Sequence, residues 1–326
     1  MFREDFVWGV ASSAYQVEGT DAADGRGACV WDMFAADGRV FEHQNADTSC
    51  DHMHHYKEDI ALMKHLGIRA YRFSLNWARI LPEGTGRVNE KAIAMYRDMI
   101  LTMKENGITP YLTLFHWEFP QALYERGGWQ NPDVVQWFGE YAKVVAENFS
   151  DICEYFITIN EPQCVVGLGH LSGVHAPGVK LPVAQTFLVA HHLLMAHGQA
   201  VINLRRYAVR PVRIGFAPTG GVAYPYTDRP EDIEAAKKVY FGFYNPIDNW
   251  TWNVSWFSDP VFLGHYPEEG LKKFAPYLPE TTHEDMELIY QPLDFMGQNI
   301  YNGYYVRAGT DGEPEFVDRA PGFPKT

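Results

Sequence analysis

Short runs of β-branched and aromatic residues alternate along this chain with longer stretches of helical periodicity. This alternation constrains the fold most, because a strand followed by a helix and a further strand is the repeating unit of a parallel sheet. Six such steps with right-handed connections predict a barrel or an open doubly wound sheet. The expected strands span residues 6–11, 68–74, 108–115, 155–159, 212–217 and 293–299.

The expected helices lie between these strands, and several end at residues that commonly stop a helix. Gly67 and Gly107 follow helical patterns directly and precede a strand, which is the usual place for a C-terminal glycine. We find no linker and no internal repeat, so the sequence predicts one domain over residues 1–326. The main helices are expected at residues 54–66, 90–105, 134–148, 183–207, 231–244 and 282–290.

Composition and charge exclude several classes of function. The net charge is 27 − 41 = −14 with no basic cluster, which argues against nucleic acid and anionic membranes as partners. No run of about eighteen apolar residues predicts a membrane span, and the first residues lack the apolar core of a secretory signal. No Gly-x-Gly-x-x-Gly turn follows a strand, which disfavours a dinucleotide site.

The four cysteines show no paired spacing, so we expect reduced thiols in a cytoplasmic protein. Cys50, His52, His54 and His55 lie close together in the sequence, but their spacing does not fit a standard zinc site. A helical pattern continues directly from them. We therefore expect a polar helix start here, and neither a metal nor a cofactor.

Unusual polar and aromatic residues follow the C-terminal ends of the expected strands. In a (β/α)₈ barrel, this end of the strands carries the active site. An asparagine beside a glutamate can hold a sugar hydroxyl and protonate a glycosidic oxygen, although glycoside hydrolysis needs two carboxylates. The residues at the strand ends are Gln16, Trp77, His116, Trp117, Asn160, Glu161 and Tyr301.

A series of motifs resembles glycoside hydrolase family 1, the β-glucosidase family, and runs from one end of the chain to the other. The resemblance implies a (β/α)₈ barrel of the TIM type, of which this chain holds the first six βα units. It also implies that residues 1–326 form a single catalytic-barrel domain that is incomplete at its C-terminus. The motifs are residues 6–19, 71–80, 112–117, 126–129, 158–162, 175–178, 256–260 and 294–301.

The resemblance assigns the central chemistry to Glu161, which would be the general acid/base of a retaining β-glycosidase. Asn160 would bind the sugar 2-hydroxyl next to it. Arg72 and Tyr301 would position the nucleophilic carboxylate and keep it ionised, and Asn299 would support the site. For the acid step, burial or a neighbouring anion must keep a proton on such a carboxyl group.

Three more residues would hold the sugar ring itself. By the same resemblance, Gln16 and His116 bind ring hydroxyls, and Trp117 lies beside them. Two positions depart from the family pattern: Gln163 stands where many relatives carry tryptophan, which leaves the preference for the leaving group open. Thr219 stands where many relatives carry an asparagine that hydrogen-bonds near the acid/base.

The nucleophilic glutamate is missing from the sequence. Relatives carry it in an Ile-Thr-Glu-Asn-Gly-like motif on the seventh strand, and no such motif occurs here. Glu105 precedes Asn106 and Gly107, but this triplet lies at a helix end before a strand, on the wrong side of a barrel. Glu18, Glu118, Glu313 and Glu315 also lack the setting of a nucleophile.

Two functions follow as expectations. The first is a retaining β-glucosidase that acts on β-glucosides or cello-oligosaccharides by double displacement, with negligible activity in the isolated chain. The second is an inactive fragment in a swapped or complemented oligomer that at most binds sugar. Unpaired edge strands would favour association, because a barrel removes its edges only by closing.

Overall fold

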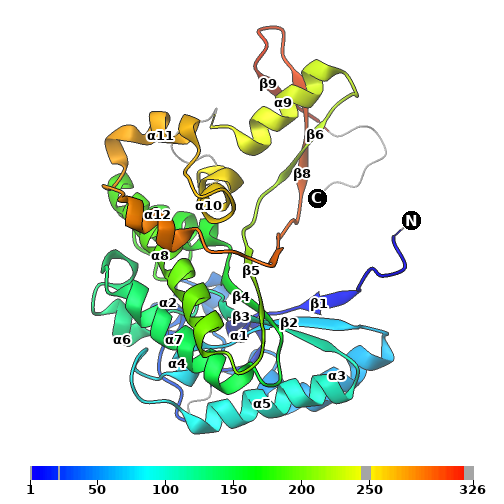
Figure 1. The fold of residues 1–326 in the computed structure, drawn as a ribbon, viewed down its shortest axis with the longest axis vertical. Coiled ribbons are helices and arrows are strands. Elements are labelled where there is room, and N and C mark those ends of the chain that lie inside the picture. Colours follow the sequence, from blue (N-terminus) through cyan, green and yellow to red (C-terminus); the bar gives the residue numbers. More distant parts are fainter. Residues whose placement is uncertain (1, 21–22, 244–250, 319–326) are drawn as a thin grey trace.

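A six-stranded parallel sheet forms the centre of the protein, with strand order β1-β2-β3-β4-β5-β7 (Figure 1). The computed structural model describes residues 2–20, 23–243 and 251–318. Five of these strands are neighbours in chain order, which confirms the predicted series of parallel βα units. The strands are β1 (Gly9–Ala11), β2 (Ala70–Ser74), β3 (Thr109–Phe115), β4 (Tyr155–Asn160), β5 (Arg213–Ala217) and β7 (Phe295–Met296).

Helices connect and surround these strands. Residues 90–105 and 183–207 are helical with the predicted bounds. Helix α9 was expected to reach Tyr244, which lies outside the described residues. The α-helices are α1 (Ala14–Val17), α2 (Val30–Ala36), α3 (His52–His65), α4 (Trp77–Ile80), α5 (Glu90–Glu105), α6 (Gln121–Tyr124), α7 (Val134–Phe149), α8 (Val183–Tyr207), α9 (Pro230–Phe241), α10 (Asn253–Phe262), α11 (Glu268–Phe274) and α12 (His283–Ile289).

The two outer strands of the sheet are shorter than the sequence predicted. Strands were expected over residues 6–11 and 293–299, whereas β1 pairs over three residues and β7 over two. Each has a neighbour on one side only among the described strands, and an isolated bridge between Thr219 and Asn299 continues the β5–β7 pairing. All three residues of β1 are exposed. Unpaired strand edges of this kind present free backbone donors and acceptors.

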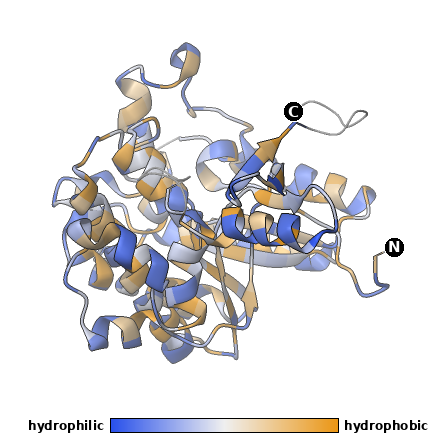
Figure 2. Cartoon of the chain, turned by 90° about the horizontal axis from the view of Figure 1, so that it is seen from above, coloured by the Kyte–Doolittle hydropathy of each residue, from blue (hydrophilic) through white to orange (hydrophobic). Residues whose placement is uncertain are grey.

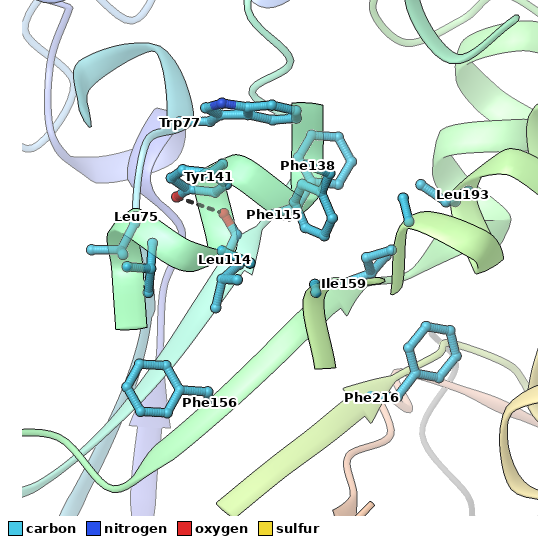
Figure 3. Close-up of a cluster of buried hydrophobic side chains, with 14 of the residues drawn as sticks. Leu75, Trp77, Leu114, Phe115, Phe138, Tyr141, Phe156, Ile159, Leu193 and Phe216 are labelled. Atoms are coloured by element: carbon cyan, nitrogen blue, oxygen red, sulfur yellow. Dashed lines mark hydrogen bonds between the residues drawn. The ribbon is translucent and has the colours of Figure 1, made fainter. Parts of the chain in front are cut away.

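The core lies between the sheet and the helices that follow β3 and β4. The Trp77 ring stacks on Tyr141 of α7, with ring centroids 5.0 Å apart. The Tyr141 hydroxyl donates to the Leu114 carbonyl of β3 at 3.0 Å (Figure 3). Apolar residues dominate the central strands, and the outer helices mix apolar and polar residues (Figure 2). This packing fixes the strand ends that carry the site.

A second, smaller sheet was not predicted. It has the order β6-β8-β9, with β6 (Val222–Pro225), β8 (Gly303–Ala308) and β9 (Pro314–Val317). Helix α9 packs against it through Ala235, Ala236 and Val306. Figure 1 shows this unit beyond the C-terminal ends of the central strands. Residues 218–230 were expected to be irregular, because short strands of mixed polarity give little periodic signal.

Within the described ranges, no helix combines the length and apolar composition needed to cross a bilayer. No group of three or more histidine, cysteine or acidic side chains in these ranges could hold a metal ion. His52, His54 and His55 lie in the first turns of α3, where the sequence placed a polar helix start. They interact with acidic residues of the same segment.

Candidate active site

Glu161 lies directly after β4, at the C-terminal end of the central sheet. Its side chain is buried, with 4% of the residue exposed. Its backbone has a φ of 47°, and its N–H donates to the Ala217 carbonyl of β5 at 2.7 Å. The β4–β5 register shifts between Ile157 and Asn160. The strand therefore ends in a sharp, hydrogen-bonded turn that fixes the direction of the glutamate.

Both carboxylate oxygens of Glu161 accept hydrogen bonds. Asn299 Nδ2 donates to Oε1 at 2.6 Å, and the Cys164 thiol donates to Oε2 at 3.2 Å. Cys164 begins the π-helical segment η3 (Cys164–Leu171), which follows the strand at once. Burial raises the pKa of the Cys164 thiol, and the Glu161 carboxylate raises it further. The thiol is therefore a neutral donor, and sequence reasoning missed its contact because it depends on the π-helical turn.

Asn160 is the centre of a hydrogen-bond network that joins four predicted residues. Its Oδ1 accepts from Arg72 Nη2 at 2.5 Å and from Asn299 Nδ2 at 2.8 Å. Its Nδ2 lies 3.1 Å from His116 Nε2. Arg72 Nη1 in turn donates to Asn299 Oδ1 at 3.1 Å. The structure thus brings together five predicted residues from distant parts of the sequence. They are Arg72, His116, Asn160, Glu161 and Asn299.

Arg72 faces neutral partners within this network. Its third hydrogen bond goes to Thr113 Oγ1 at 3.0 Å, a contact that the sequence did not suggest. Among the described residues, Arg72 forms no ion pair within 4.0 Å. Burial lowers its pKa, which Glu161 and then Tyr301 oppose. A desolvated guanidinium with only neutral hydrogen-bond partners is a strong attractor for an additional carboxylate.

His116 and Trp117 form one wall of the site. Burial and the nearby Arg72 charge lower the pKa of His116 well below its ordinary value, so the imidazole is neutral. Trp117 has a φ of 86°, and its Nε1 donates to the Asn160 carbonyl at 3.1 Å. The Trp117 ring also lies 5.6 Å from the His175 ring. A neutral imidazole and an aromatic face are suited to a sugar ring, which has hydroxyls and an apolar face.

Tyr301 and Gln16 are both exposed. Tyr301 is 81% exposed, yet burial of its hydroxyl and the Glu161 carboxylate raise its pKa. Most of the Tyr301 side chain faces outward. Gln16 is exposed on α1. The role of Gln16 as a sugar ligand stays a prediction.

The two positions that depart from the family pattern contact each other. Gln163 is 1% exposed, and its Nε2 donates to the Thr219 carbonyl at 2.9 Å. Its Oε1 accepts from the Thr219 N–H at 3.3 Å. The Thr219 hydroxyl donates to the Asn299 carbonyl at 3.1 Å. Gln163 is therefore directed toward the end of β5, and Thr219 supports Asn299 through the backbone.

The five acidic residues that the sequence analysis set aside as nucleophiles are not placed as a second catalytic carboxylate in the described structure. Glu105 ends α5 at the N-terminal side of the strands, and Gly107 adopts a φ of 75° after it, as a helix stop requires. Glu18 forms a buried ion pair. Glu313 and Glu315 form exposed ion pairs on or next to β9. Glu118 is buried near His116 but hydrogen-bonds to α1.

The arrangement can transfer a proton and bind hydroxyl groups. A buried carboxyl group with an amide beside it, at the carboxyl end of parallel strands, is typical of barrel enzymes that cleave glycosidic bonds. Comparison with known proteins refines this class. Residues 1–319 match the family model of glycosyl hydrolase family 1. The chain belongs to this family.

Several relatives align over nearly the whole chain. It is 42% identical over 328 residues to Beta-glucosidase A of Thermotoga maritima, covering 100% of this chain and 71% of that protein. It is 40% identical to Beta-glucosidase A of Acetivibrio thermocellus, covering 97% and 68%. Solved structures of the Thermotoga maritima β-glucosidase, with glucoimidazole or isofagomine lactam, match with a TM-score of 0.86 at 41% identity. They too are covered to 71%.

Proposed function

We propose that this chain carries the acid/base half of a retaining β-glucosidase. Glu161 protonates the leaving oxygen of a terminal β-D-glucosyl residue and later removes a proton from water. Asn160, His116, Trp117 and Gln16 hold the glucosyl ring. The observation that supports this most is the buried Glu161 carboxyl group, held by Asn299 beside the Asn160 amide. β-Glucosides and cello-oligosaccharides are the proposed substrates.

The nucleophile is proposed to come from outside this chain's described residues. A retaining enzyme places its two carboxyl groups about 5–5.5 Å apart. The desolvated Arg72 guanidinium, with neutral partners only, supports a missing anion at this place. Arg72 and Tyr301 would hold that carboxylate ionised and directed at the anomeric carbon. Without it, we expect negligible hydrolysis by the isolated chain.

The experiment that tests this is a nitrophenyl β-D-glucoside assay on the homogeneous chain. We expect turnover indistinguishable from buffer. Adding the unaligned portion of the Thermotoga maritima relative as a second polypeptide should then restore turnover. Glu161→Gln should abolish the restored activity, and Glu105→Gln is the matched control that should leave it unchanged. Robust turnover by the chain alone, lost in Glu161→Gln, would contradict the external nucleophile.

A second candidate is a non-catalytic assembly, in which the chain forms a swapped or complemented oligomer that at most binds sugar. The exposed β1 and the short β7 support it, because each has an unpaired edge among the described strands. Light scattering with intact mass separates the two. A monomer with a single cooperative melt argues against association.

The four unpaired cysteines support our placement of the chain in the cytoplasm.

A further inference from the structure

Glu118 is a buried carboxyl group that the proposed chemistry does not use. It lies two residues beyond His116, in the loop after β3, and 1% of it is exposed. Its Oε1 accepts a hydrogen bond from the Tyr15 backbone N–H at 2.8 Å, across 103 positions of sequence. Tyr15 is the neighbour of Gln16 in α1. One side chain thus joins the two loops that carry Gln16 and His116.

Helix α1 depends on such outside contacts for its first turn. The N-terminal N–H groups of a helix have no partner within the helix, and Ser13 at the N-cap provides no side-chain bond. The Ala14 N–H instead donates to Ser74 Oγ at the end of β2, at 2.7 Å. The Tyr15 N–H donates to Glu118. Two side chains from neighbouring strand ends therefore fix where α1 begins.

We propose that Glu118 is a positioning residue that holds Gln16 in register with His116 across the sugar site. It acts through the Tyr15 N–H and touches no reacting atom. The sugar-binding consequence rests on the proposed function. The link between Glu118 and α1 is independent of the proposed function, because it is a hydrogen bond within the fold.

The surroundings of Glu118 favour its neutral form. Burial raises its pKa to about 8, the Tyr15 and Glu118 N–H groups lower it, and Glu18 raises it. The other titratable groups that face it are Arg26, Cys29 and Tyr141. Its Oε2 is buried and has no hydrogen-bond partner among the described residues.

Burial raises the pKa of Glu118 by more than Arg26 lowers it, and neither nearby arginine forms an ion pair with Glu118. Arg26 pairs with Asp32 at 2.8 Å, and Arg79 pairs with Glu18 at 3.3 Å. Deprotonation would therefore leave a buried negative charge without an ion-pair partner, which is costly. We expect the loop after β3 and α1 to separate as the pH rises through 8, and Gln16 to leave its register with His116.

Hydrogen exchange of the peptide that contains Tyr15 tests the link directly. In the wild type, its protection factor should fall about tenfold from pH 7 to pH 9, one unit above the raised pKa. Glu118→Gln keeps the oxygen acceptor and removes the titration, so its protection should stay constant. Glu118→Ala should be poorly protected at both pH values. Glu105→Gln is the matched control and should behave as the wild type.

Calorimetric binding of isofagomine lactam, an uncharged amide that a relative binds, tests the consequence for the sugar site. Wild-type affinity should fall between pH 7 and pH 9 in proportion to the loss of the closed state that hydrogen exchange reports, and Glu118→Gln should remove this dependence. Full protection of the peptide in Glu118→Ala, or equal profiles of wild type and Glu118→Gln, would overturn the inference. A wild type that binds no lactam, with exchange as expected, would instead overturn the proposed function and leave the link intact.

Discussion

Replacing His197 by glutamine should remove part of the acid sensitivity of this fold. His197 lies on α8 and is fully buried. Its Nδ1 is 2.6 Å from the Thr158 hydroxyl, and its ring centroid is 4.9 Å from that of Phe216. Its Nε2 is buried without a partner among the described residues. Thr158 lies in β4, so this histidine supports the strand that ends at Glu161.

The magnitude follows from the pKa of His197, which burial lowers from 6.5 to about 3. Below pH 6.5, the unfolded chain binds a proton at this position and the folded chain does not. Stability is therefore complete above pH 6.5 and is lost as the pH falls toward 3. At pH 4, the difference amounts to about 2.5 pKa units, or about 3 kcal/mol of unfolding free energy.

Urea denaturation at pH 7 and pH 4 measures this quantity. Between these pH values, His197→Gln should lose about 3 kcal/mol less of unfolding free energy than the wild type. Glutamine can still hydrogen-bond to Thr158, so the variant should fold at pH 7. His283→Gln is the matched control, because that side chain is 81% exposed. Equal losses in wild type and His197→Gln would refute the argument.

Three further predictions concern packing, backbone space and the site. Trp77→Ala should lower the unfolding free energy by about 3–5 kcal/mol, because this side chain is fully buried. Trp8 is 56% exposed, so Trp8→Ala should cost far less. Equal losses of unfolding free energy in denaturation curves would contradict the core assignment. Gly27→Ala should lower the melting temperature, because a Cβ there would lie 2.0 Å from the Pro82 carbonyl oxygen. An unchanged melting temperature would show that the backbone at Gly27 or Pro82 moves without cost to make room. Asn299→Ala should weaken isofagomine lactam binding about tenfold or more, because Asn299 holds Glu161 and Asn160 in place and leaving a buried polar group unpaired costs about 1–3 kcal/mol. The exposed Asn302 provides the alanine control, and unchanged calorimetric affinity would remove Asn299 from the site.

The central βα units were predictable because their patterns are local. The helix at Glu90–Glu105 has regular apolar spacing and ends before Gly107, and its bounds were correct. The β6-β8-β9 sheet was not predictable. Val222 of β6 pairs with Gly303 of β8, 81 positions away, in strands of mixed polarity. Neither segment carries a periodic signal, since the sheet faces are only partly covered.

The proximity of several candidate site residues was predictable, whereas their contacts were not. Their catalytic and sugar-binding roles stay predictions. His116, Asn160 and Glu161 lie at or just after strand ends, and parallel strands bring such ends together. Arg72 lies within β2 and was named only through the family resemblance. The contact between Cys164 and Glu161 depends on an irregular helical turn, and no spacing rule predicts it. The hydrogen bonds between Gln163 and Thr219 could not be predicted from the sequence either. The two residues are 56 positions apart, and the sequence shows each only as a separate departure from the family pattern.

Glu161 and Trp117 both have positive φ angles, of 47° and 86°. For residues other than glycine, such a backbone costs about 1–3 kcal/mol, and surrounding contacts must enforce it. Glycine adopts the same angles without this penalty. Glycine at either position would relieve this strain, but it would also remove the side chain and its hydrogen bonds. The strained backbone is therefore a cost in stability that the fold bears in order to direct these two side chains at the ends of β3 and β4.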